Sequence, residues 1–218
     1  MAYEFVRRAD GPIMCRLDAE EKAVIAQVAQ EIAELVRTDL GLEQESEETQ
    51  DAAESEDPLR RLEAEFASRE ARHPADSAVR RLFPDAASDP GQAEEYRRLA
   101  QGELADAKLE ALHQVTCSLD GSGPGNSEVV LSRPEAERWL RALTDMRIVL
   151  ADRLGVRRDG DFETLQMLQG LEVPEEAEPA PTQTDGTAGP DLVAAIYELL
   201  SWLQESLVAA MDPGPDDR

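Results

Sequence analysis

The chain has 218 residues, a formal net charge of −25 and an apolar content of 41%. This length provides one good-sized hydrophobic core or two small ones. The negative charge would repel a duplex phosphate backbone, so we expect no tight nucleic-acid binding by the isolated chain.

Two stretches hold much of the negative charge. Glu43–Asp57 has eight acidic residues and no basic one, and Glu172–Asp191 has six acidic residues, four prolines and no basic one. Such low apolar content is typical of solvated linkers. We therefore expect a single domain over residues 1–218, with acidic linkers at 43–57 and 172–191.

The first predicted element is a β-hairpin over Glu4–Leu17. Asp10-Gly11 is a strong turn signal between its two short runs. Residues alternate between the two faces of a strand, so Cys15 lies on the apolar face of the second run.

A long helix is predicted next. Asp18 and Glu21 have the spacing of a capping box, and Gly41 is placed to end the helix. Apolar residues recur between them at helical spacing: Ile25, Val28, Ile32, Leu35 and Leu40.

The middle of the chain predicts three more helices and a second hairpin. Short helices are expected over Pro58–Phe66 and Pro74–Pro84, and a longer one begins at Pro90. In Val115–Ser132, residues in a strand-like alternation surround a Gly-rich centre. This pattern predicts a second hairpin, which could share one small sheet with the first. The expected core contacts of the longer helix are Tyr96, Leu99, Leu109 and Leu112.

The clearest helical signal covers Ser132–Gly155. Ser132 and Glu135 form a second capping-box pattern, and Trp139 opens a run of apolar residues at helical spacing. Together these elements predict a mainly α fold with a small antiparallel β-sheet (α+β): a helical core with one or two hairpins.

The last predicted helix, Leu192–Met211, is apolar over most of its circumference. Such a helix is central to a core. Glu198 and Glu205, and the lack of flanking Lys or Arg, argue against a membrane span of this length. An alternative stays open, in which one side of the helix, with Trp202, Leu203 and Leu207, forms an interaction or dimer surface.

Catalytic and metal-binding signatures are sparse. The two histidines, His73 and His113, have no partners at metal-ligand spacing. The Gly-rich segment Asp120–Gly125 has neither the Lys nor the helix that follows a phosphate-binding loop. We therefore predict no catalytic residue, no metal and no cofactor, and we disfavour an enzyme.

The two cysteines, Cys15 and Cys117, lie in or beside predicted strands. Cysteines on adjacent strands can reach the Cα separation of about 4.4–6.8 Å that a disulfide needs. The bond would close a loop of 117 − 15 = 102 residues and would be a candidate redox switch. The alternative is two buried, reduced thiols, which a reducing cytosol favours.

Several segments together resemble a known family. Among them are "RLDAEEKAVIAQVAQEIAELV", "WLRALTDMRIVLADRLGV" and "IYELLSWLQESLV", in this order. They are similar to an actinobacterial family that contains a domain of unknown function and has members described as oxidative-stress regulators (AosR-like). These are helix-face patterns and not catalytic signatures.

The resemblance implies a cytoplasmic regulator. Such a protein would contact the transcription machinery, a sigma factor or RNA polymerase, and respond to redox state through cysteines. Two alternatives stay open: a structural homodimer with no redox role, and an enzyme with an unrecognised site between helices.

Overall fold

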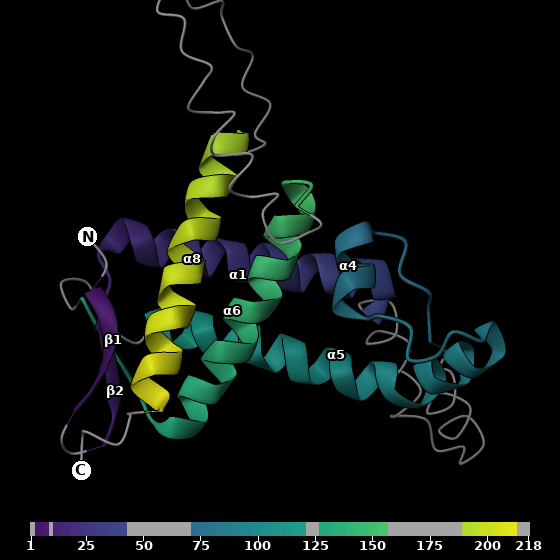
Figure 1. Cartoon of the computed structure of the whole chain (residues 1–218), viewed down its shortest axis with the longest axis horizontal. Helices are drawn as coiled ribbons and strands as arrows, with labels where there is room; N and C mark the ends of the chain where they lie inside the picture. Colours follow the sequence, from purple (N-terminus) through teal and green to yellow (C-terminus); the bar gives the residue numbers. More distant parts are fainter. Residues whose placement is uncertain (1–2, 9–10, 43–70, 121–126, 157–188, 213–218) are drawn as a thin grey trace, which may run out of the picture.

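The computed structural model describes residues 3–8, 11–42, 71–120, 127–156 and 189–212. These ranges contain three strands and five helices (Figure 1). The strands are β1 (Tyr3–Arg7), β2 (Ile13–Arg16) and β3 (Glu128–Leu131). The helices are α1 (Ala19–Leu40), α4 (Ser77–Leu82), α5 (Pro90–Asp120), α6 (Arg133–Arg153) and α8 (Pro190–Met211). The prediction of a mainly helical α+β fold is confirmed.

Some predicted segments lie outside the described residues. They are the acidic linker Glu43–Asp57, the short helix Pro58–Phe66 and nearly all of the second acidic linker. The last two residues of that linker, Pro190 and Asp191, belong to α8.

The sheet is antiparallel, with strand order β1-β2-β3. The predicted first hairpin is confirmed, and Gly11 in its turn has a φ of 107°, which suits glycine. In the β2–β3 pair, Cys15 lies opposite Val129 and Ile13 opposite Leu131. These four side chains are buried, so they form the inner face of the sheet.

The predicted second hairpin is wrong. Helix α5 continues to Asp120, and only Glu128–Leu131 forms a strand. The physical reason is packing, because Val115 and Leu119 are buried at helical spacing from Leu112. Burial on one helix face has overridden the strand preference of the β-branched residue. At the other end of α5, the expected core residues Tyr96 and Leu99 are exposed.

Both predicted ends of α1 and the predicted start of α6 are confirmed. Asp18 accepts a hydrogen bond from the Glu21 backbone N–H, and the Glu21 side chain accepts one from the Asp18 N–H, both at 2.9 Å. Gly41 ends α1 with a φ of 71°. At the start of α6, the Ser132 N–H donates to the Glu135 carboxylate at 2.7 Å.

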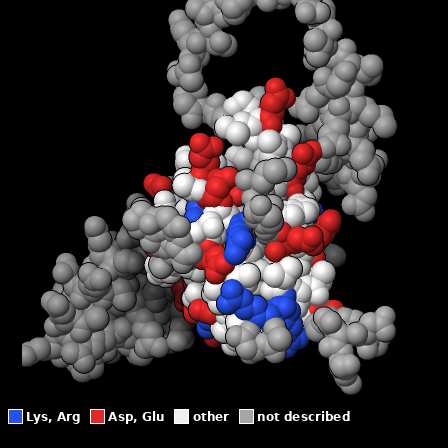
Figure 2. All heavy atoms as spheres, turned by 90° about the vertical axis from the view of Figure 1, so that its left-hand side faces the viewer, with Lys and Arg blue, Asp and Glu red and all other residues white. Residues whose placement is uncertain are grey.

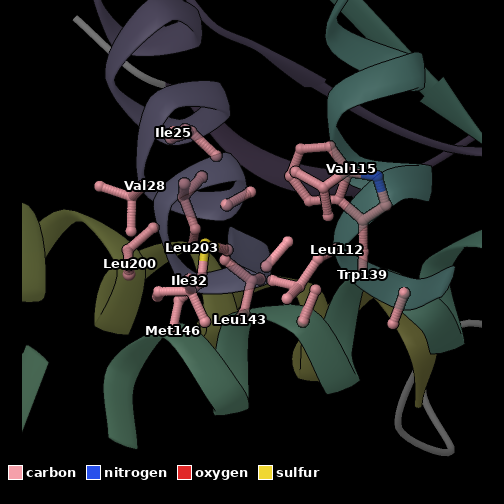
Figure 3. Packing of buried hydrophobic residues seen from close by; sticks show 14 of the residues in the cluster. Ile25, Val28, Ile32, Leu112, Val115, Trp139, Leu143, Met146, Leu200 and Leu203 are labelled. Carbon is pink, nitrogen blue, oxygen red and sulfur yellow. The ribbon is translucent and has the colours of Figure 1, made fainter. Parts of the chain in front are cut away.

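The core lies between crossing helices. Helices α6 and α8 run steeply across α1 and α5 (Figure 1). Figure 3 shows Ile25 and Val28 of α1, Leu143 and Met146 of α6, and Leu200 of α8 gathered in one cluster. The main backbone neighbours of α8 are α6 and β1.

Candidate functional site

Helix α8 is buried towards its C-terminus and exposed towards its N-terminus. Leu200, Leu203 and Leu207 are fully buried. Leu192 is 52% exposed, and Ile196 is only partly covered. The N-terminal end of the helix extends well beyond α1 (Figure 1). The predicted core helix is therefore a core element over only half of its length.

By length and composition alone, residues Asp191–Met211 could also cross a membrane. Of the 18-residue window that passes this test, 22% is buried inside the protein. The core helix of a soluble protein can meet the same criterion, and three leucines of α8, Leu200, Leu203 and Leu207, are fully buried in the core of this chain.

An acidic stripe with a tryptophan at its centre runs along the solvent side of α8. Glu198, Trp202 and Glu205 are four and three residues apart, so they share one face of the helix. Trp202 is 37% exposed, and both glutamates are exposed. Exposed tryptophan is a frequent anchor in protein interfaces, and flanking carboxylates favour a basic partner. We call Glu198, Trp202 and Glu205 the α8 stripe.

The other two residues predicted for an interaction surface lie elsewhere. Leu203 and Leu207 have no exposed surface, because they point into the core of their own chain. Helical rotation separates Leu203 from its neighbour Trp202 by about 100°. The prediction is thus wrong for these two leucines. Trp202, the third residue predicted for this surface, does lie on it.

Polar contacts fix α8 against its neighbours. Arg147 of α6 donates to the Gln204 side chain at 2.8 Å, and its guanidinium lies 5.3 Å from the centre of the Tyr197 ring. The Phe5 N–H of β1 donates to Ser206 Oγ at 3.2 Å. These contacts hold one side of α8 inward, so the α8 stripe is presented outward on a fixed scaffold.

Cys15 is buried on the inner face of the sheet. Desolvation raises the pKa of its thiol from 9.0 to about 12. The thiolate is the reactive form of cysteine, so burial and this raised pKa make Cys15 inert near neutral pH.

Cys117 lies in a different setting, on α5 and exposed to solvent. The prediction that it sits on a strand near Cys15 is wrong, because α5 extends to Asp120. Both cysteines are free thiols in this structure. The proposed disulfide therefore loses the strand-to-strand geometry on which it was based.

His113 is the residue that the sequence analysis missed. Its Nε2 lies 3.3 Å from Cys117 Sγ, one helical turn away. The signal was the spacing of four residues, which brings two side chains together only on a helix. It was overlooked because Cys117 was assigned to the predicted second hairpin, which begins at Val115, and not to the helix that carries His113. An imidazole at this distance can accept the thiol proton when the sulfur reacts.

A buried ion pair joins α5 to α6. Lys108 Nζ lies 2.6 Å from Asp145 Oδ1, and Asp145 is only 5% exposed. Desolvation raises the pKa of Asp145, and the hydrogen bond from Lys108 opposes this rise. The pair is enclosed by its helices, so we interpret it as a structural link.

The ring of His73 contacts the carbonyl of Pro74, its neighbour in the chain, at 3.1 Å. Within the part of the chain that the structure describes, no three His, Cys, Asp or Glu side chains are grouped to hold a metal ion.

Comparison with family models gives a match over residues 2–211, to a domain of unknown function (DUF2017). The chain belongs to the DUF2017 family. Neither the curated proteins nor the solved structures yield a match. The DUF2017 match takes in every described helix and strand, including α8 and its stripe.

Proposed function

We propose that this DUF2017 protein is a non-enzymatic cytoplasmic regulator that binds a component of the transcription machinery. The preferred partner is a sigma factor, on its own or within RNA polymerase. The observation that carries the proposal is the α8 stripe, in which exposed Trp202 lies between Glu198 and Glu205. The resemblance to AosR-like stress regulators supports the choice of partner.

The charge of the chain supports a basic docking segment. A net charge of −25 steers a basic partner towards the surface and raises the association rate. Trp202 then supplies an apolar contact and a ring face for Lys or Arg. The partner segment should therefore combine Lys or Arg with apolar side chains.

The test of this interface is a binding measurement with sigma factors and RNA polymerase from the source organism. We expect Trp202→Ala to weaken complex formation at least tenfold, as the loss of a central aromatic anchor does. Tyr96→Ala is the matched control, because Tyr96 is an exposed aromatic residue on a different helix. Equal binding by wild type and Trp202→Ala would refute an α8 interface.

The redox part of the proposal rests on Cys117 with His113. Hydrogen peroxide would oxidise the Cys117 thiolate to a sulfenic acid. An S–O bond forms, the O–O bond breaks, hydroxide leaves, and the sulfur loses the two electrons that the peroxide gains. The exposed position gives oxidants access that Cys15 does not have.

Mass spectrometry after mild peroxide treatment tests this assignment. We expect oxidation at Cys117, slower oxidation in His113→Gln, and no modification of Cys15 until the chain is unfolded. Partner binding by the oxidised protein should differ from binding by the reduced protein, and Cys117→Ser should abolish the difference. Unchanged binding after complete oxidation of Cys117 would remove the redox role and leave the α8 interface unaffected.

A further inference from the structure

His113 and Cys117 form a pair of metal-ligating side chains near the C-terminal end of α5. They are one helical turn apart, and both are exposed. The Nε2 atom of His113 lies 3.3 Å from Cys117 Sγ, and the Nδ1 atom lies 3.8 Å from it. Within the residues that the structure describes, the His113 ring makes no hydrogen bond to any other side chain. The pair is therefore open to a third group from solvent.

The separation of the two atoms is close to what one zinc ion requires. Zinc binds an imidazole nitrogen at about 2.0–2.1 Å and a thiolate sulfur at about 2.3 Å, with tetrahedral angles. Two such bonds place the nitrogen and the sulfur about 3.6 Å apart. The observed Nε2–Sγ distance of 3.3 Å differs from this value by a few tenths of an ångström. Small rotations of the two exposed side chains supply the difference.

The helix holds the backbone of both ligands in place. Leu112, Val115 and Leu119, which lie among the ligand positions in the sequence, are buried in the core. This part of α5 is thus anchored before any ion arrives. A ligand pair on a rigid element avoids most of the ordering cost of binding.

The donor atoms select the kind of metal. A thiolate and an imidazole favour a borderline ion such as Zn²⁺. The hard ions Mg²⁺ and Ca²⁺ prefer oxygen ligands, and they gain little from sulfur. Zinc is therefore the ion that this pair fits.

The charge around the pair favours a cation. Asp120 is exposed and lies three residues after Cys117, on the same side of the helix. On the face of the molecule that Figure 2 shows, Asp and Glu are spread widely, whereas Lys and Arg gather in its lower part. A net charge of −25 raises the local concentration of cations at such a surface.

We propose that His113 and Cys117 bind a zinc ion, with water in the remaining coordination positions. A bond forms between the metal and the sulfur, and the thiol proton leaves to solvent. Two of the four ligands of a structural zinc site predict a Kd in the micromolar range, so the ion is exchangeable. The inference goes beyond the proposed function and does not depend on it, because coordination requires neither oxidation of Cys117 nor a partner protein.

The test is a titration of the full, reduced chain, without a histidine tag, with Zn²⁺. Isothermal titration calorimetry in the presence of millimolar Mg²⁺ measures the affinity, because Mg²⁺ occupies sites made only of carboxylates. We expect one zinc ion per chain. A titration with Cd²⁺ should give the ultraviolet charge-transfer absorbance of a metal thiolate.

Substitutions identify the ligands. Cys117→Ser and His113→Gln should each raise the Kd for Zn²⁺ at least about tenfold, because each removes a ligand. Cys117→Ser should also abolish the absorbance with Cd²⁺. His73→Gln is the matched control, because His73 is the other histidine of the chain, and it should leave Kd unchanged.

A further variant separates geometry from composition. His113→Gln/Gln114→His keeps every residue type but turns the imidazole by about 100° around the helix. It should bind zinc as weakly as His113→Gln does. Circular dichroism of each variant checks that the fold is retained.

The reactivity of the sulfur gives an independent measurement. Saturating zinc should slow the alkylation of Cys117 by iodoacetamide at least about tenfold, because the metal occupies the thiolate that would react. A chelator should restore the original rate. Oxidation of Cys117 by peroxide is measured on the metal-free chain, so failure of the zinc site and failure of the redox role are distinguishable.

Three results would overturn the inference. One is zinc binding that survives both ligand substitutions in the presence of Mg²⁺. Another is an unchanged rate of Cys117 alkylation under saturating zinc. The third is one zinc ion per two chains with dimerisation in analytical ultracentrifugation, since a second copy and not water would then complete the coordination.

Discussion

Helices α6 and α8 carry the same kinds of side chain in opposite settings. The tryptophan of α6, Trp139, is fully buried and donates its indole N–H to Ser118 Oγ at 2.9 Å, whereas Trp202 of α8 is partly exposed. The buried carboxylate of α6, Asp145, is paired with Lys108, whereas Glu205 of α8 faces solvent. Both of these buried polar groups of α6 have a partner within the protein. On the α8 stripe the same chemistry remains accessible to another molecule.

The largest expected effect is at Trp139. Trp139→Ala should lower the free energy of unfolding by about 4 kcal/mol, because it removes the largest buried side chain and leaves a cavity. Urea unfolding followed by circular dichroism measures the change. A loss below about 1 kcal/mol would mean that this part of the core is not packed as described.

The next effect concerns the buried charge. Asp145→Ala should cost about 3 kcal/mol, because Lys108 would be left without its partner in a mostly buried position. The double variant Lys108→Met/Asp145→Leu should recover most of this loss, because no unpaired charge remains. If the double variant is as unstable as the single variant, packing and not charge determines the cost.

The same carboxylate predicts a dependence on pH. Burial raises the pKa of Asp145 in the folded protein above its value in the unfolded chain. Its contribution to stability is then fully present below the unfolded pKa and is lost as the pH rises through the folded pKa. Asp145→Asn should remove this component from the pH profile of unfolding, which urea unfolding at a series of pH values measures.

The sequence predicted what depends on local pattern. The capping residues Asp18 and Ser132, the turn at Gly11 and the run that begins at Trp139 all lie where they were expected. Each of these signals is read within one or two turns of the chain. These local structures therefore do not depend on how the rest of the chain packs.

Tertiary packing decided what the sequence did not predict. Val115 was assigned to a strand, yet it is buried on α5 together with Leu112. That one misassignment also separated Cys117 from His113. The pairing of Arg8 and Arg16 with Glu128 could not be predicted either, because Arg8 follows β1, Arg16 lies on β2 and Glu128 lies on β3. In α8, periodicity identified the helix but not that its N-terminal half is only partly covered.

A smaller loss of stability is expected at Ser118. Ser118→Ala should cost about 1–2 kcal/mol, because the buried Trp139 N–H would lose its acceptor. Ser88→Ala, at an exposed position between α4 and α5, is a control for which we expect less than about 0.5 kcal/mol. Equal effects from the two substitutions would mean that the Trp139 hydrogen bond contributes nothing to stability.

The smallest change in stability is expected at Trp202. Trp202→Phe should alter the free energy of unfolding by less than about 1 kcal/mol, because the side chain is partly in water already. With Trp202 replaced, Trp139 is the only tryptophan, and its emission should be blue-shifted and poorly quenched by iodide. In Trp139→Phe the remaining Trp202 should emit at longer wavelength and be quenched readily. A blue-shifted, unquenched Trp202 in the isolated chain would show that its side of α8 is already covered, and the α8 stripe could then bind a partner only after that cover is displaced.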